Sequence, residues 1–169
     1  MWYFKNIYFL VILLFICLAC CGYKPSGRST INMPENVQNL YLEKVTNPST
    51  LSWLEPRLRT ALRDELNQRG QINWVRQQDA QGLMQIEITR FSTSSKVTGT
   101  KQQTLRSEVI LEMSAQIFRG KDHTLLWSAN DILVQETFET HNQADEFSAG
   151  QRAIDLAVQR LANQLNQGF

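Results

Sequence analysis

The strongest constraint on the fold of this chain is a strict alternation of side chains between Leu105 and Phe118. The odd-numbered positions are mostly apolar and the even-numbered positions are mostly polar. Odd positions hold Leu105, Ser107, Val109, Leu111, Met113, Ala115 and Ile117, and even positions include Arg106, Glu108, Glu112, Ser114 and Gln116. Successive side chains of a strand point to opposite faces of its sheet, so this period of two predicts a long strand with one buried and one polar face.

Two other segments have the three- and four-residue apolar spacing of amphipathic helices. The first helix is expected to start between Ser52 and Glu55, where Ser-x-x-Glu has capping-box spacing, and to end at Gly70. The second is expected over about Gln143 to Gln164. Their apolar stripes are Leu54, Leu58, Ala61, Leu62 and Leu66 in the first, and Ala153, Leu156, Ala157, Leu161 and Leu165 in the second.

Three further strands are predicted: Val37–Val45, a segment that begins at Leu83, and Leu125–Val134. The phase of the last strand slips near Asn130-Asp131, which predicts a bulge. Residues 92–103 are predicted to form a loop longer than a tight hairpin needs.

The predicted fold is an α+β two-layer sandwich with the order strand–helix–strand–strand–strand–helix. The first helix connects the first two strands, which we therefore expect to be parallel neighbours or near-neighbours. Each helix has one apolar stripe, so both should pack on one face of a four-stranded mixed sheet. The other face, lined by Thr, Ser, Gln and Glu, must then meet water or a partner.

The N-terminus has the three parts of an export signal: Lys5, a run of 13 apolar residues from Ile7 to Ala19, and a small-residue zone with cysteines. About 20 apolar residues are needed to cross a bilayer, and this run is shorter. We interpret residues 1–20 as a lipoprotein signal peptide, residues 21–36 as a lipidated N-terminus with a flexible tether, and residues 37–169 as a single domain.

The lipid would be attached to a cysteine at the cleavage point. Cleavage before Cys21 gives Leu18-Ala19-Cys20-Cys21, which keeps Leu at its usual place in such signals. Cleavage before Cys20 places a better small residue, Ala19, before the thiol but a poorer residue at the first position. Cys21 is the preferred assignment and Cys20 is the alternative.

Composition argues against several classes of function. Beyond Lys5 the chain carries 16 basic and 16 acidic residues, and this balance does not favour nucleic-acid binding. All three cysteines lie in the signal zone, so the folded part offers no disulfide and no thiolate metal site. Neither metal-ligand spacing nor a catalytic constellation is visible, and we expect no enzyme, no metal and no cofactor apart from the covalent lipid.

Basic residues gather at two places along the predicted sheet. Lys96, Lys101 and Arg106 surround the predicted long loop, and Arg119 and Lys121 flank the next hairpin, at the opposite end. Lys and Arg donate charge-assisted hydrogen bonds to phosphates. The first cluster is therefore a charge-based candidate for contact with an anionic lipid, against the simpler interpretation of solvated loop charges.

The join Cys21-Gly22-Tyr23-Lys24-Pro25 resembles the start of mature LPS-assembly lipoproteins, the LptE family. The segments LYLEKVTNPS, LEPRLRTALRDELNQRG and AIDLAVQRLANQL fit that family in order and spacing, and Cys20 stands where the family usually has Gly. The resemblance implies two helices packed on a four-stranded sheet.

The same resemblance implies a function. Members of the family sit inside the lumen of the LptD β-barrel and help it deliver lipopolysaccharide to the cell surface. It therefore implies an outer-membrane lipoprotein, anchored by palmitate-type chains, with its domain on the periplasmic side or within the barrel lumen. Lys96, Lys101 and Arg106 would be its lipopolysaccharide contacts. The alternative is a lipid-anchored periplasmic adaptor of another envelope or secretion complex.

The lipidation assignment predicts that Cys21→Ala abolishes labelling of the protein by radioactive palmitate, because it removes the acylated thiol. Cys20→Ala is the matched control and should leave labelling intact. The reverse result would assign the lipid to Cys20, and labelling of the double variant would contradict a cysteine-linked anchor.

Overall fold

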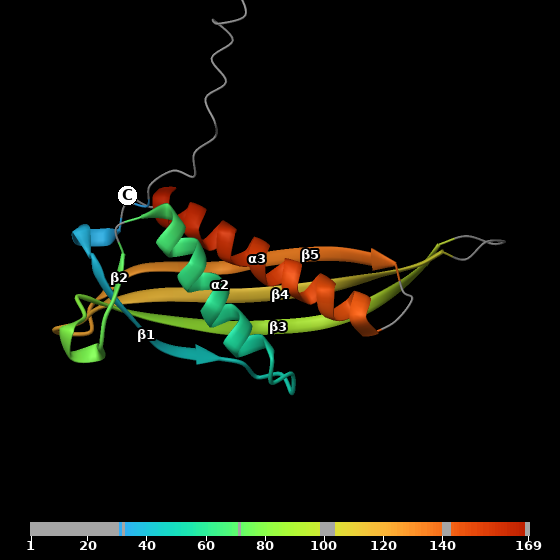
Figure 1. Ribbon diagram of the computed structural model, residues 1–169, viewed down its shortest axis with the longest axis horizontal. Coiled ribbons are helices and arrows are strands. Elements are labelled where there is room, and N and C mark those ends of the chain that lie inside the picture. The colour runs from blue at the N-terminus through green and yellow to red at the C-terminus, as the bar shows by residue number, and fades with distance from the viewer. Residues whose placement is uncertain (1–30, 32, 71, 99–103, 140–142, 168–169) are drawn as a thin grey trace, which may run out of the picture.

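The computed structural model describes residues 31, 33–70, 72–98, 104–139 and 143–167 as one mixed sheet covered by two helices (Figure 1). Five strands form the sheet in the order β2-β1-β3-β4-β5. The strands are β1 (Asn39–Thr46), β2 (Asn73–Trp74), β3 (Gly82–Thr98), β4 (Thr104–Arg119) and β5 (Leu125–Glu139). The helices are α2 (Leu54–Arg69) and α3 (Gln143–Gln167), with short 3-10 turns η1 (Pro34–Asn36) and η2 (Gln77–Asp79). Cys20, Cys21 and Lys101 lie outside the described residues.

The α+β class is confirmed, but the predicted number of strands is wrong, because the sheet has five strands and not four. The additional strand is β2, which pairs in parallel with β1 through Asn39–Asn73 and Leu40–Trp74. A strand of two residues is too short to show alternation, so its sequence carries no periodic signal. The parallel pairing of β1 with β3 agrees with the predicted helical connection.

The long loop predicted over residues 92–103 is also wrong. β3 continues to Thr98, and β4 begins at Thr104, so most of the predicted loop is strand. Residues 92–95 read Ser-Thr-Ser-Ser, which has no apolar alternation, although their backbones pair in register with β4. Backbone pairing with a strongly patterned neighbour therefore extends the strand beyond its own sequence signal.

The predicted bulge in the last strand is confirmed. Met113 and Ala115 of β4 face Ile132 and Ala129 of β5, so two β5 residues lie where β4 has one. Asp131 has a positive φ of 58°. The extra residue returns the next apolar side chains of β5 to the buried face.

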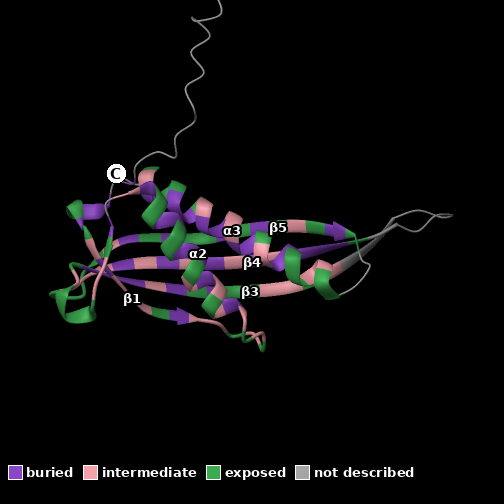
Figure 2. Cartoon of the chain, viewed as in Figure 1, coloured by how far each residue is buried: buried purple, intermediate pink, exposed green. Residues whose placement is uncertain are grey.

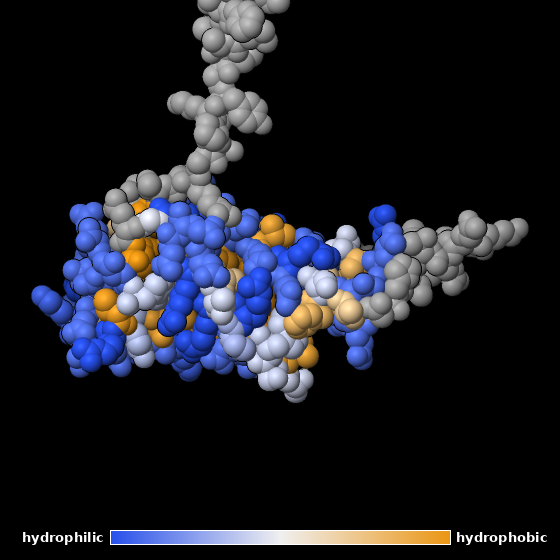
Figure 3. Space-filling view, in the orientation of Figure 1, coloured by the Kyte–Doolittle hydropathy of each residue, from blue (hydrophilic) through white to orange (hydrophobic). Residues whose placement is uncertain are grey.

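Both helices cover the same face of the sheet (Figures 1 and 2). All five residues of the predicted α2 stripe are buried, as are most of those predicted in α3. In α3 the buried residues include Ala149, Gly150, Ala153 and Ala157, whose small side chains let the helix approach the sheet closely. The outer surface of the helical layer is mostly hydrophilic (Figure 3). Within the described residues, neither helix combines the length and apolar character needed to span a bilayer.

Part of the predicted tether belongs to the packed domain. Ile31 and Met33 are 7% and 9% exposed and join the core next to Val37. The domain therefore extends N-terminally at least to Ile31.

The predicted capping box at the start of α2 does not form. The helix begins at Leu54 with Trp53 at the N-cap position, and no side chain caps it. The Glu55 carboxylate instead accepts a hydrogen bond from Arg59 Nε at 2.9 Å. The loop before the helix is organised by Asn47, which donates to the Leu51 carbonyl and accepts from the Ser49 backbone. Gly70 ends α2 with a φ of 88°, as expected of a C-terminal glycine.

Two polar contacts join α2 to α3. At one end Arg57 Nη2 donates to both carboxylate oxygens of Asp155 at 2.6 and 2.8 Å. At the other end Arg69 Nη1 donates to Asn163 Oδ1 at 2.6 Å, while Arg69 Nε donates to Glu65 Oε1 at 2.7 Å in a buried ion pair. These contacts hold the two helices in one relative position over the sheet.

The turn between β4 and β5 is fastened to the loop before β3. Gly120 N donates to the Gln81 carbonyl at 2.8 Å. A Cβ atom at Gly120 would lie 2.2 Å from the Ala80 carbonyl oxygen, which is backbone and cannot rotate away. Only glycine fits this close approach.

We therefore predict that Gly120→Ala destabilises the domain by about 1–3 kcal/mol, the usual cost of forcing atoms into a packed site. The exposed neighbour supplies a control: Lys121→Ala should change the free energy of unfolding by less than about 0.5 kcal/mol. Urea denaturation followed by circular dichroism measures both. Equal stability of Gly120→Ala and the parent would contradict the close approach.

Candidate functional site

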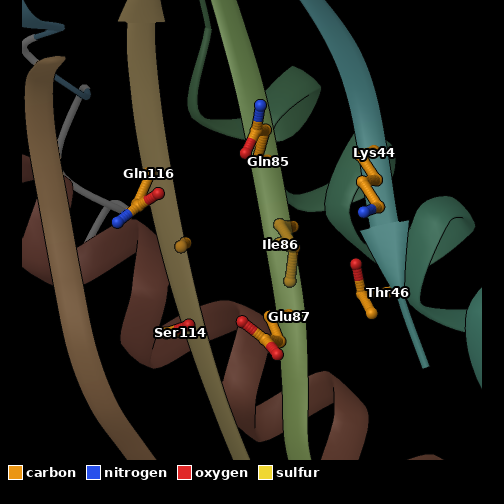
Figure 4. Close-up of a pocket in the computed structure, with 8 residues that line it drawn as sticks. Lys44, Thr46, Gln85, Ile86, Glu87, Ser114 and Gln116 are labelled. Carbon is orange, nitrogen blue, oxygen red and sulfur yellow. The ribbon is translucent and has the colours of Figure 1, made fainter. Parts of the chain in front are cut away.

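The face of the sheet opposite the helices is open and carries two rows of polar side chains (Figure 4). Each row crosses β1, β3 and β4 in register. The first row is Lys44, Gln85 and Gln116, and the second is Thr46, Glu87 and Ser114. Together they line a shallow hollow of about 210 Å³. The predicted polar open face is therefore present in the structure.

Most of these side chains have no hydrogen-bond partner among the described residues. Gln85 Nε2 donates to Glu43 Oε2 at 2.9 Å. Within the described part of the chain, Lys44, Glu87 and Gln116 form no side-chain hydrogen bond or ion pair with other residues. The hollow thus presents an ammonium, a carboxylate and an amide together, a mixed set that suits a polar protein surface.

An apolar row crosses the same open face next to the hollow. Tyr41, Leu83 and Phe118 are paired across β1, β3 and β4, and Leu125 of β5 faces Phe118. Leu83 is only 2% exposed although it lies outside the main core cluster, whereas Leu125 is 50% exposed. This row was not predicted from the sequence, although Tyr41, Leu83 and Phe118 each stand at the polar phase of their own strand.

The structure brings two of the three predicted basic residues together. Lys96 is the direct cross-strand partner of Arg106, and Arg106 faces Glu139 on β5. These positions lie near the tip of the β3–β4 hairpin, at the right in Figure 1.

The second basic cluster, at the opposite end, is largely neutralised by neighbouring acids. Arg119 Nε donates to Glu35 Oε2 and its Nη1 donates to Asp122 Oδ2, both at 3.0 Å. These two carboxylates raise the pKa of Arg119 above its ordinary value. The Thr124 backbone N–H, with a smaller effect from Arg119, lowers the pKa of Asp122 below its ordinary value. This guanidinium is therefore already paired within the fold, while Lys121 beside it is exposed.

The residue types that bind metals are scattered through the described part of the chain. Among them, no three side chains of the His, Cys, Asp and Glu types gather as a metal site would require. His123 lies exposed in the β4–β5 turn with a positive φ of 54°. The open sheet face, with its polar hollow and its apolar row, is the candidate functional surface.

Comparison with known proteins adds a family and a fold. The family model described as "LptE: Lipopolysaccharide-assembly" matches residues 37–167. No curated protein matches the chain.

Several solved structures share its architecture. A putative neuraminyllactose-binding hemagglutinin homolog from Helicobacter pylori aligns with a TM-score of 0.57 at 10% identity, covering 86% of this chain and 91% of that chain. An uncharacterized lipoprotein B from Nitrosomonas europaea gives 0.55 at 15% identity, covering 87% and 92%. A putative lipoprotein from Caulobacter crescentus gives 0.51 at 16% identity, covering 75% and 88%. At these identities the similarity establishes the fold alone.

Proposed function

Because the match over residues 37–167 shows that this chain belongs to the lipopolysaccharide-assembly family LptE, we propose that it is a non-catalytic lipoprotein of the outer membrane. In this proposal it plugs and supports an LptD-type β-barrel and assists the assembly of lipopolysaccharide at the cell surface. The family match, which spans almost the whole folded domain, carries the proposal.

The chemistry of the open sheet face supports a barrel as the partner. The interior walls of outer-membrane barrels are polar. The hollow around Lys44, Glu87 and Gln116 offers both donors and acceptors to such a wall. A face of this kind, left uncovered by the chain itself, can be enclosed without burying charges against an apolar surface.

The proposed lipid anchor would keep the domain close to the membrane. Nine residues lie between Cys21 and Ile31, the first described residue of the packed domain, so the connection has ten steps from one Cα atom to the next. A fully extended chain spans at most about 3.3–3.6 Å per residue, so this connection reaches about 35 Å. Stable attachment needs more than one acyl chain, and the proposed N-terminal cysteine would carry several, as in mature bacterial lipoproteins.

The proposal predicts that affinity purification of the full-length lipoprotein from detergent-solubilised membranes recovers a large β-barrel protein of the LptD type. Mass spectrometry identifies the recovered protein. Recovery of soluble periplasmic proteins alone would contradict the proposal. Normal surface lipopolysaccharide after depletion would favour an adaptor of another envelope complex.

A second prediction concerns the basic residues of the β3–β4 hairpin. Lys96→Glu combined with Lys101→Glu should weaken binding of purified lipopolysaccharide, because two charge-assisted contacts to phosphate are replaced by repulsion. Lys121→Glu, at the opposite end of the sheet, is the control and should bind normally. Unchanged binding by the double variant would mean that both lysines are ordinary solvated charges that do not contact lipopolysaccharide.

A further inference from the structure

β3 extends far beyond the strand that pairs with it on one side. The ladder between β1 and β3 ends at the pair Thr46–Glu87. Asn47-Pro48 then takes the chain away from the sheet, while β3 continues for 11 residues, Ile88–Thr98, paired only with β4. Figure 1 shows this: β1 ends at about the middle of the sheet and β3 continues to the right. This stretch is an open sheet edge.

No other described segment bonds to the backbone of this edge, although the Thr93 hydroxyl donates to Glu146 of α3 at 2.7 Å. The backbone hydrogen bonds that lie outside regular elements include none from residues 88–98. A strand bonded on one side presents a row of N–H and C=O groups to the other side, where another strand can add. Residues 92–95 are Ser and Thr without proline, so the edge keeps its backbone donors.

The opposite edge of the sheet, formed by β5, is protected against pairing with another strand. β5 has its bulge at Asn130-Asp131, and the Arg160 guanidinium of α3 donates to the Leu133 carbonyl. Arg152 of α3 also reaches Glu136 at 3.4 Å. Bulges, charges and covering side chains are the usual means by which proteins block edge pairing. The β3 edge has only a bulge at Thr89, near its start.

An aromatic cluster lies beside the open edge on the helical side. The ring of Trp53 packs edge-on against Phe91 and Phe147, with centroids 5.8 and 4.8 Å apart. Gly150 makes room for it, since a Cβ there would lie 2.7 Å from Trp53 Cη2. Phe147 is nevertheless 43% exposed, and apolar surface is visible beside the start of α3 in Figure 3. An apolar side chain on an added strand could pack there.

The charge of the edge selects the kind of strand that would add. Ile88–Thr98 contains Arg90 and Lys96 and no acidic residue. The Arg90 side chain is 54% exposed: its Nε donates to Ser92 Oγ at 3.2 Å and its Nη1 lies 3.6 Å from Glu112 Oε1, so much of the guanidinium stays at the surface. A carboxylate opposite Arg90 on a neighbouring strand would complement it, since opposite charges stabilise cross-strand pairs.

We propose that the edge of β3 from Ile88 to Ser94 binds an extended segment of a protein partner as an added β-strand. The segment places a carboxylate opposite Arg90 and, on the alternate face, an apolar side chain against Phe91 and Phe147. This is strand addition, in which backbone bonds supply affinity and alternate side chains supply specificity. It rests on the proposed function, because the partner is the barrel protein recovered with the lipoprotein.

The first experiment maps the edge by photo-crosslinking in membranes that contain the full-length lipoprotein. Benzoylphenylalanine replaces Ser92 in one variant and Gln135 in the other. Both positions lie in the row that crosses Ile110, Ser92 on the open edge and Gln135 on the protected one. We expect the Ser92 variant to crosslink to one short segment of the barrel with a carboxylate and an apolar residue in alternation, and Gln135 to give no such segment.

The second experiment removes a backbone donor. Ser92→Pro and Thr93→Pro are compared, because adjacent strand residues direct their N–H groups to opposite neighbours. One of the two prolines removes an N–H group that bonds to β4, and this variant should have a lower unfolding midpoint. The other removes only an N–H group at the open edge, and this variant should keep the midpoint of the parent. The variant that keeps its midpoint should recover about tenfold less barrel protein, the effect of losing roughly 1.4 kcal/mol.

A charge variant tests the proposal even if both proline variants unfold, because it leaves the backbone of β3 unchanged. Arg90→Glu should lower barrel recovery severalfold, whereas Arg76→Glu, 82% exposed on another part of the surface, should not. Normal recovery with all edge variants, and no Ser92 crosslink, would overturn strand addition and leave the proposed function standing. A crosslink to a second copy of this chain would also overturn it. Failure to recover a barrel with the parent protein would overturn both.

Discussion

The pairing of β4 with a long neighbour on each side is the constraint on which the rest of the structure depends. β4 is in register with β3 over its whole length and with β5 over most of it. Its alternation therefore decides which face of all three strands is buried, since a shift of one residue would exchange the two faces. The bulge at Thr89 places both Ile88 and Phe91 on the buried face, and the bulge in β5 does the same for Ala129 and Ile132.

β1 ends well before its neighbour β3, which makes the two ends of the sheet different. Five strands stand side by side at one end, but only β3, β4 and β5 continue to the other. The polar hollow lies at the last point where β1 is present, since Lys44 and Thr46 form its β1 wall. The open β3 edge begins immediately beyond. A partner could therefore contact the open face and the open edge at once, because the two surfaces adjoin near Glu87 and do not overlap.

Sequence patterns predicted those elements whose own residues carry a period. The α2 stripe, the β4 alternation, the bulge near Asn130-Asp131 and the terminal Gly70 all have local causes, and each is confirmed. β2 was missed because two residues show no period, and the far half of β3 was missed because its Ser-Thr-Ser-Ser run is ordered by pairing with β4. The predicted capping box is absent: α2 begins at Leu54, so Trp53 and not Ser52 is its N-cap residue, and Glu55 pairs with Arg59. The polar face was predictable, whereas the open edge depends on where β1 ends relative to β3, which only the register reveals.

Electrostatics distinguishes the two ends of the sheet. Near the β4–β5 turn, Arg119 is paired with Glu35 and Asp122, so its charge is used within the fold. Near the hairpin tip, Lys96 and Arg106 stand directly opposite each other. Like charges at such positions destabilise a strand pair, and Arg106 has an acidic residue, Glu139, as its cross-strand partner on β5. The two ends of the sheet therefore differ in charge: at the β4–β5 turn two carboxylates surround one guanidinium, whereas near the hairpin tip two basic residues share one acidic cross-strand neighbour.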